Sequence, residues 1–206
     1  MIFATLLAMA ALADPVPASA APPLKVVTSL TTYGAIAREI VGDKGTVTSI
    51  AQGDEDPHFV QPKPSFVAVL RDADMFVTTG LDLELWVPPL LDRAGNRKVS
   101  EGGPGYVTAY TGIHLLEVPT SLSRSEGDIH QDGNPHIHTD PLNGIIIARN
   151  ILTGLQRVSP DNAGFFAARA GLPAPDWAPS LRELQLGQLR IALPWAASEL
   201  GLPAPA

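Results

Sequence analysis

The sequence predicts an α/β fold built on a parallel sheet. From residue 24 onward, short runs rich in β-branched residues alternate with stretches of helical periodicity, which is typical of strand-helix-strand units. At 206 residues with 45% apolar content, the chain is long enough to bury a hydrophobic core. It contains no internal repeat of fixed period.

The first predicted strand covers Leu24 to Leu30, where valine and threonine follow one another. A helix is expected over Thr31 to Val41, because its apolar residues recur at helical spacing and a glycine follows it. A second strand, Thr46 to Ala51, leads into a polar loop. Ser65 is then expected to cap a helix that runs through Ala73.

Further elements are predicted in the middle of the chain. Met75 to Thr79 is expected to form the third strand. Leu83 to Arg93 is expected to be helical, in two short pieces, because the two prolines inside it remove backbone donors. Tyr106 to Tyr110 and Leu115 to Val118 are candidates for additional strands.

A polar loop is expected over Ser121 to Asp140, with a long helix after it. Asp140 is placed to act as N-cap and Pro141 to occupy the first helical position, where a missing N–H costs nothing. The apolar residues of this helix recur every three or four positions, which predicts one buried face. They are Ile147, Ile151, Leu155 and Val158.

The helix is expected to end at Ser159-Pro160, and Pro160 is placed to open a further helix that reaches Ala170. After this point glycine and proline become frequent. Little regular structure is therefore expected in the tail, except over Ser180 to Leu193.

Residues 1–20 resemble a secretory signal peptide. An apolar stretch from Ile2 through Leu12 is followed by the small-residue triplet Ala18-Ser19-Ala20, after which cleavage would leave Ala21 as the first residue. No basic residue precedes the apolar stretch, so a buried N-terminal helix stays open as the alternative. No other segment approaches the roughly 20 apolar residues that span a bilayer.

Charge and cysteine content limit the function classes. The net charge of -7 provides no basic surface for phosphate backbones, so no nucleic-acid partner is expected. The absence of cysteine excludes disulfides, thiolate metal ligands and lipid attachment through an N-terminal cysteine. Any metal must therefore be held by histidines and carboxylates, in an exported protein expected to be soluble and not lipid-anchored.

The first candidate ligand is His58, in the segment Asp54-Glu55-Asp56-Pro57-His58 directly after the second predicted strand. Ligands of parallel α/β sheets bind beyond the carboxyl ends of the strands, where this loop is expected. A neutral imidazole binds zinc, and a nearby carboxylate can orient the ring. An exposed loop histidine beside solvated acids is the alternative.

A second candidate group is the histidine-rich segment 128–140, which holds His130, His136 and His138. Three of the five histidines fall within nine residues, which favours a metal site over chance. If the backbone around His136 is extended, His136 and His138 project to the same side and can share one ion. His114, in an apolar setting, is expected to be structural.

Four segments, in this order and spacing, resemble the solute-binding proteins of zinc and manganese ABC importers. They are VVTSL, GDEDPHFVQPKPS, TTGLDLELW and GNPHIHTDP. The resemblance covers about residues 24–170. It is most specific in the Asp-Pro-His and Asn-Pro-His motifs and in the Asp-Pro pair at 140 and 141.

Members of this family have two α/β lobes, which are joined by a linking helix and clasp one metal ion between them. The resemblance implies that this chain forms the N-terminal lobe. One histidine from each motif of the N-terminal lobe is a ligand, which carries over to His58 and His136. The segment GDIHQDGNPH resembles a family variant with an added histidine in the preceding loop, so His130 is an accessory candidate. His138 replaces an aromatic residue found in many relatives.

The implied organisation has four parts: a signal peptide at 1–20, the metal-binding lobe at 21–140, a helical segment leading to the inter-lobe linker at 141–170, and an aberrant tail at 171–206. Relatives build a second lobe that supplies further ligands. Only 36 residues follow Ala170 here, so the second lobe is expected to be largely missing, and a frameshift or premature stop is the hypothesis for its loss. Without that lobe, the metal ion is expected to be bound weakly, at an open site completed by water.

The implied function is capture of a divalent ion in the periplasm by a monomer, with delivery to an ABC transporter permease. Nitrogen and oxygen ligation with several histidines favours Zn²⁺ over Mn²⁺. Two alternatives stay open: a zinc hydrolase in which Glu55 or Asp56 is the general base, and a truncated lobe that transports nothing. The absence of a His-Glu-x-x-His motif weighs against the hydrolase, so an enzyme is not expected.

Overall fold

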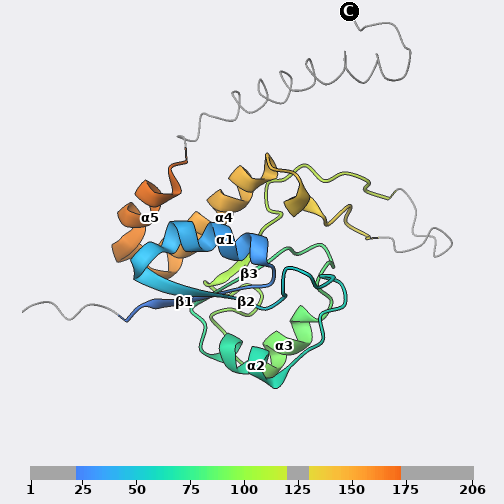
Figure 1. Ribbon diagram of the computed structural model, residues 1–206, viewed down its shortest axis with the longest axis horizontal. Coiled ribbons are helices and arrows are strands. Elements are labelled where there is room, and N and C mark those ends of the chain that lie inside the picture. Colours follow the sequence, from blue (N-terminus) through green and yellow to red (C-terminus); the bar gives the residue numbers. More distant parts are fainter. Residues whose placement is uncertain (1–21, 120–129, 173–206) are drawn as a thin grey trace, which may run out of the picture.

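The computed structural model describes residues 22–119 and 130–172, and a four-stranded parallel sheet forms their centre (Figure 1). The sheet has the order β2-β1-β3-β4, and each neighbouring pair is parallel. Its strands are β1 (Leu24–Thr28), β2 (Gly45–Ser49), β3 (Met75–Thr78) and β4 (Tyr106–Thr108). The predicted α/β fold with a parallel sheet is therefore confirmed.

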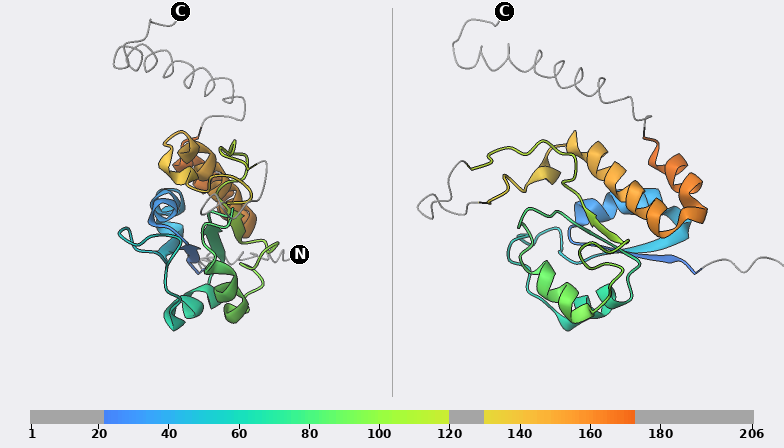
Figure 2. Two further views of the ribbon diagram at one scale, coloured as in Figure 1. Left: turned by 90° about the vertical axis from the view of Figure 1, so that its right-hand side faces the viewer. Right: turned by 180° about the vertical axis from the view of Figure 1, so that it is seen from behind.

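Helices cover both faces of the sheet, as parallel sheets require (Figures 1 and 2). On one face, α1 contacts both α4 and α5, and on the other α2 packs against α3. Three short 3-10 turns, at 42–44, 137–139 and 160–162, connect elements. The helices are α1 (Thr31–Val41), α2 (Pro64–Arg71), α3 (Val87–Ala94), α4 (Asn143–Val158) and α5 (Ala163–Ala170).

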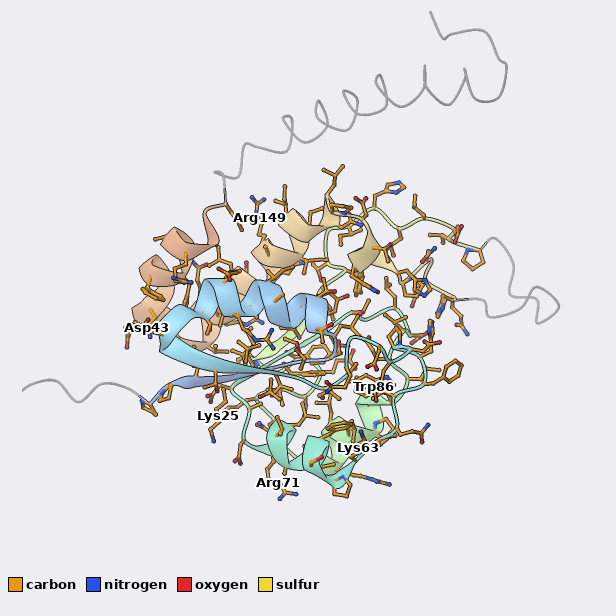
Figure 3. All side chains as sticks on the ribbon, in the orientation of Figure 1. Lys25, Asp43, Lys63, Arg71, Trp86 and Arg149 are labelled. Carbon is orange, nitrogen blue, oxygen red and sulfur yellow. The ribbon has the colours of Figure 1, made fainter. Side chains whose placement is uncertain are left out.

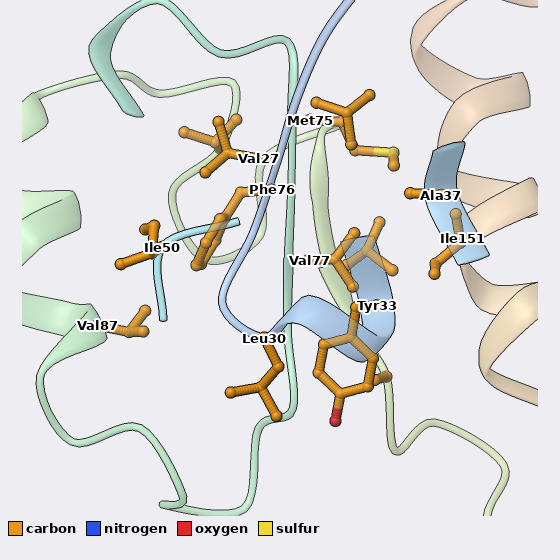
Figure 4. Packing of buried hydrophobic residues seen from close by; sticks show 14 of the residues in the cluster. Val27, Leu30, Tyr33, Ala37, Ile50, Met75, Phe76, Val77, Val87 and Ile151 are labelled. Carbon is orange, nitrogen blue, oxygen red and sulfur yellow. The ribbon is translucent and has the colours of Figure 1, made fainter. Parts of the chain in front are cut away.

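The core lies on both sides of β3, whose residues Met75, Phe76 and Val77 are completely buried. Figure 4 shows them between Ala37 and Ile151 on one side and residues of the α3 layer on the other. Burial on both faces explains why apolar residues follow one another directly at Val26-Val27 of β1 and along most of β3, instead of alternating with polar residues. This packing fixes the strand ends that lead into the loops described below.

The helix starts differ from prediction. Lys63, not Ser65, precedes α2, because Pro64 takes the first helical position that its fixed φ suits. Helix α4 begins at Asn143 rather than Pro141. The predicted cap, Asp140, instead accepts a hydrogen bond from the Leu142 amide at 2.9 Å, in a turn that leads into the helix.

Two segments predicted as regular structure are irregular. Residues 83–86 are not helical, because Gly80, Leu81 and Asp82 all have positive φ and turn the chain before α3 begins. Residues 115–118 form no strand: the Leu116 carbonyl accepts a bond from the Asn134 amide, and Glu117 has a φ of 54°. This segment therefore pairs with the histidine-rich loop instead of extending the sheet.

The predicted helix from Pro160 to Ala170 is confirmed as a 3-10 turn followed by α5. The predicted signal peptide, most of the predicted tail and the helix at 180–193 lie outside the described residues. Within residues 22–119 and 130–172, no helix is both long and apolar enough to span a membrane.

Gly154 permits the close approach of α4 to the sheet. A Cβ added there would lie 2.5 Å from Val107 Cγ2 and 2.9 Å from Met75 Sδ, whereas a Cβ at Gly144 of the same helix meets nothing within 4 Å. We expect Gly154→Ala to lower the free energy of unfolding by about 1–3 kcal/mol through overpacking. Gly144→Ala, the matched control, is expected to leave it unchanged or raise it slightly. Urea unfolding of both variants measures this, and equal stabilities would contradict the packing described here.

Candidate metal site

Two histidines far apart in the sequence meet beyond the carboxyl ends of the strands. His58 lies in the loop between β2 and α2, and His136 lies in the segment before α4. These two segments approach one another at the right of Figure 1. The ring centroids of His58 and His136 are 5.2 Å apart, and both side chains are half-buried.

His58 is oriented by Asp56, two residues before it. Asp56 Oδ1 accepts hydrogen bonds from the His58 backbone amide at 3.0 Å and from Nδ1 of the ring at 2.8 Å. Because an ionised carboxylate only accepts, Nδ1 must carry the proton in this bond. The lone pair of Nε2 is therefore available for a metal, as in carboxylate-histidine-zinc arrangements.

His136 is held by the same local geometry. Asn134 Oδ1 accepts from the His136 amide at 2.9 Å and lies 2.9 Å from Nδ1 of the ring. Asn134 is itself fixed, because its side-chain amide donates to Glu117 at 2.8 Å. The Asp-Pro-His and Asn-Pro-His motifs thus present both imidazoles through Nε2.

The spacing of the two rings suits a shared ion. Zinc-nitrogen bonds of about 2.0–2.1 Å at a tetrahedral angle place the centroids of two bound imidazoles roughly 5 Å apart. The observed 5.2 Å matches this value. The two side chains therefore need little movement to bind one divalent ion together.

Electrostatics in the loop favour the charged form of Asp56. The backbone hydrogen bond from His58 is the largest cause lowering the pKa of this carboxyl, followed by the side-chain bond from the same residue. Asp56 therefore remains an acceptor at neutral pH. Its negative charge also favours a cation beside the two rings.

His130 adds a third ring to the pair. Its centroid lies 5.4 Å from that of His58 and 6.0 Å from that of His136. Nevertheless, across the described ranges no three histidine or acidic side chains are arranged to hold an ion without rearrangement. The pair of His58 and His136 is thus the organised part of the site.

His138 lies beside the group, with its ring 6.5 Å from His136 and edge-on to Tyr33 at 6.2 Å. The extended backbone on which a common orientation of His136 and His138 depended is not formed, because residues 137–139 make a 3-10 turn. Nδ1 of His138 is buried without a hydrogen-bond partner, and burial lowers the pKa of this ring, with a smaller effect from His136. His138 is therefore kept neutral at the margin of the site.

The fifth histidine stands apart. His114 is exposed and lies in irregular chain after β4, so the expectation of a structural role in an apolar strand is wrong. Apolar residues at 113 and 115 suggested burial, but the strand ends before them. His114 is therefore a natural control for experiments on the other histidines.

Glu84 is a functional candidate that sequence reasoning missed. It is 4% exposed, and its carboxylate accepts hydrogen bonds from Ser29 Oγ (2.6 Å), Thr78 Oγ1 (3.1 Å), and the amide and hydroxyl of Thr79 (3.0 and 2.7 Å). Thr79 in turn shares a 2.8 Å hydrogen bond with Tyr33. The one indication in the sequence is a single acidic residue within the apolar run Leu83-Glu84-Leu85-Trp86, which the sequence analysis assigns to a helix.

Four large apolar side chains are exposed next to residues that belong to the site or contact its loops. Phe59 and Leu85 are 71% and 69% exposed; the first follows His58, and the second precedes a tryptophan that contacts the same loop. Leu116 and Val118 flank the residue that hydrogen-bonds Asn134. Phe59 therefore lies beside His58, with ring centroids 6.0 Å apart, and the other three side chains are connected to the site through their sequence neighbours.

A comparison with protein families gives one result that covers most of the chain. The model of the family described as "Zinc-uptake complex component A periplasmic" matches residues 26–172. These residues include both histidine motifs and the whole sheet beyond its first two positions.

Named relatives bind different metals. The chain is 32% identical over 161 residues to the iron-binding protein YfeA of Yersinia pestis, covering 78% of this chain and 48% of that protein. It is 31% identical over 147 residues to the manganese-binding lipoprotein MntA of Halalkalibacterium halodurans, covering 71% and 44%. Among solved structures, Zn(II)-bound AdcA from Streptococcus pneumoniae matches with a TM-score of 0.58 and 26% identity, over 81% of this chain and 32% of that one.

These alignments also define what part of a relative the chain represents. It spans about half the length, or less, of these relatives. The family consists of solute-binding proteins and not of enzymes, which confirms the prediction of a binding protein.

The geometry predicts how Asp56 contributes to metal binding. Asp56→Ala removes the oxygen that orients His58, so we expect metal affinity to fall by roughly 10–100-fold. Asp56→Asn, the matched control, recreates the arrangement seen at Asn134 and should retain most of the affinity. Competition titration with a chromogenic zinc chelator measures both. If alanine and asparagine weaken binding equally, the charge of Asp56 rather than its hydrogen bonds is what matters, and the orienting role is wrong.

Proposed function

Because the chain belongs to the family of periplasmic zinc-uptake component A proteins, we propose that it captures a divalent metal ion outside the cytoplasm and delivers it to an ABC importer. Metal binding for uptake is the property common to the family. Zinc is the proposed ion and manganese the next candidate. His58 and His136 are the proposed ligands, with His130 and His138 as accessory ligands.

The observation that carries this proposal is the pair of oriented imidazoles. Each ring has its Nδ1 engaged by an oxygen two residues earlier, and the centroids lie 5.2 Å apart. A purely structural role would not require two histidine rings that are oriented in the same way and lie this close together. Two neutral imidazoles that present Nε2 to the same space are what a divalent transition metal binds.

The donor set also supports zinc. Imidazole nitrogens suit zinc and the later transition metals, whereas manganese prefers more carboxylate oxygens. The iron-binding and manganese-binding names of two relatives belong to those proteins and leave the ion of this chain to experiment. The remaining coordination positions are proposed to be filled by water or by donors outside the described residues.

The partner proposed for delivery is the permease of an ABC transporter, and the protein is proposed to act as a soluble monomer in the periplasm. The exposed apolar side chains beside the site, Phe59 and Leu85 among them, give a surface on which such docking can bury area. An ion held at this opening is accessible from the docking side.

Substitution of the ligands tests the proposal. We expect zinc to bind the unaltered protein, and His58→Ala or His136→Ala to weaken binding by more than the roughly 10–100-fold that loss of an orienting partner costs. His114→Ala should bind as the unaltered protein does, because His114 is exposed and away from the group. Isothermal titration calorimetry measures all four proteins. Submicromolar binding that survives His58→Ala would overturn the assignment.

Acidification is a second test. Protonated imidazole has no free lone pair, so zinc affinity should fall as the solution is acidified. Affinity falls with pH because protons and the metal ion compete for the same ring nitrogens, and a lower pH raises the proton concentration. Titrations between pH 8 and pH 5 measure this, and an affinity independent of pH would exclude histidine ligation.

A further inference from the structure

The segment 80–86 links the body of the lobe to the loop that carries His58. It begins with three consecutive residues of positive φ: Gly80 (79°), Leu81 (59°) and Asp82 (60°). L side chains rarely adopt this conformation, and Leu81 is nevertheless buried, 7% exposed. Such a turn persists only where neighbouring contacts hold it in place.

Glu84 supplies the contacts that hold the turn. Its carboxylate receives donors from Ser29, directly after β1, and from Thr78 and Thr79 at the end of β3. One buried side chain thereby ties the segment to the ends of both central strands. Three of these bonds converge on Oε1 and the fourth reaches Oε2, so both oxygens of the carboxylate act as acceptors.

Trp86, two residues later, reaches the metal loop. Its Nε1 donates a 2.7 Å hydrogen bond to the carbonyl oxygen of Pro57, the residue before His58. The indole is 6% exposed, and Figure 3 places Trp86 just above α3, beside the loops beyond the strand ends. A buried donor without this carbonyl would be left unsatisfied, so the bond fixes the position of Pro57.

This bond differs from those that Asp56 makes. The Asp56 bonds to His58 lie within the loop, so they orient the ring relative to the loop but not relative to the sheet. The Trp86 bond joins the loop to the body of the lobe. His136 belongs to another segment. The 5.2 Å separation of the two rings can therefore be maintained only if the His58 loop is itself held against the sheet and its helices.

We propose that segment 80–86 is a positioning device for metal binding, in which Glu84 anchors the left-handed turn and Trp86 holds the Pro57 carbonyl so that His58 faces His136. The inference rests on the proposed function. Neither Glu84 nor Trp86 touches the ion. Both act through the loop, and their loss changes where His58 lies and how often it lies there.

Trp86→Phe tests the device, because it keeps a buried aromatic ring and removes the donor. In the metal-free protein we expect hydrogen exchange of the His58 and Phe59 amides to accelerate at least tenfold, with exchange in β1 and β3 unchanged. Zinc affinity should fall by roughly 10–100-fold, as for other groups that orient a ligand. Glu84→Gln should act in the same direction but less strongly, because glutamine keeps one accepting oxygen and loses the negative charge that strengthens the bonds to it.

Tyr106→Phe is the matched control, since Tyr106 is a half-buried aromatic at the amino end of β4, whereas the loop that carries His58 follows the carboxyl end of β2. It should change neither exchange at His58 nor zinc affinity. Unaltered exchange at His58 and Phe59 in Trp86→Phe overturns the inference, as does faster exchange throughout β1 and β3, which would make the indole a general support of the fold.

The two proposals fail in distinguishable ways. If His58→Ala does not weaken zinc binding, the proposed function is wrong, while the exchange data from metal-free protein still decide the positioning role. If His58→Ala weakens binding and Trp86→Phe binds zinc as tightly as the unaltered protein, the metal site stands and the positioning device does not.

Discussion

Parallel pairing of all four strands brings their carboxyl ends to one edge of the sheet, and the loop that carries His58 begins there. The order β2-β1-β3-β4 puts β1 and β3 in the centre, buried on both faces. Polar groups at the ends of such strands have no water, so they must bond to one another. Ser29, Thr79 and Glu84 do so, and the result is a rigid base beneath loops that are themselves mostly polar.

Above this base, short-range hydrogen bonds orient the rings of His58 and His136. In both motifs a proline separates a side-chain oxygen from the histidine, and the oxygen binds the backbone amide and the ring of that histidine. The motif thus determines its own ring orientation from three consecutive residues. What it cannot determine is the distance between the two rings, which depends on the packing of separate loops.

This division explains what the sequence predicted. Strands β1 to β4 and helices α1, α4 and α5 were predicted because apolar periodicity reports burial, which the structure confirms in residues such as Ile147 and Ile151. The motif histidines were identified from local pattern and family resemblance, and the structure brings His58 and His136 together. Their role as ligands stays a prediction.

Two of the failed predictions have long-range causes. Residues 83–86 have helical periodicity, but Glu84 bonds to strand ends far away in the sequence and the turn before it excludes a helix. The 115–118 segment has β propensity, yet its partner is the Asn134 loop rather than β4. Contacts between distant segments, which local pattern does not report, decided these two cases. The common orientation of His136 and His138 depended on an extended backbone, and a local 3-10 turn at 137–139 replaces it.

The most direct test of the central claim is the ¹⁵N chemical shift of the imidazole nitrogens with and without zinc. The account predicts that Nε2 of His58 and of His136 shift together as zinc is added, with one ion per protein, while both Nδ1 atoms stay protonated and hydrogen-bonded. If zinc leaves the Nε2 signals of these two rings unchanged, or binds one of them without the other, the shared site is wrong.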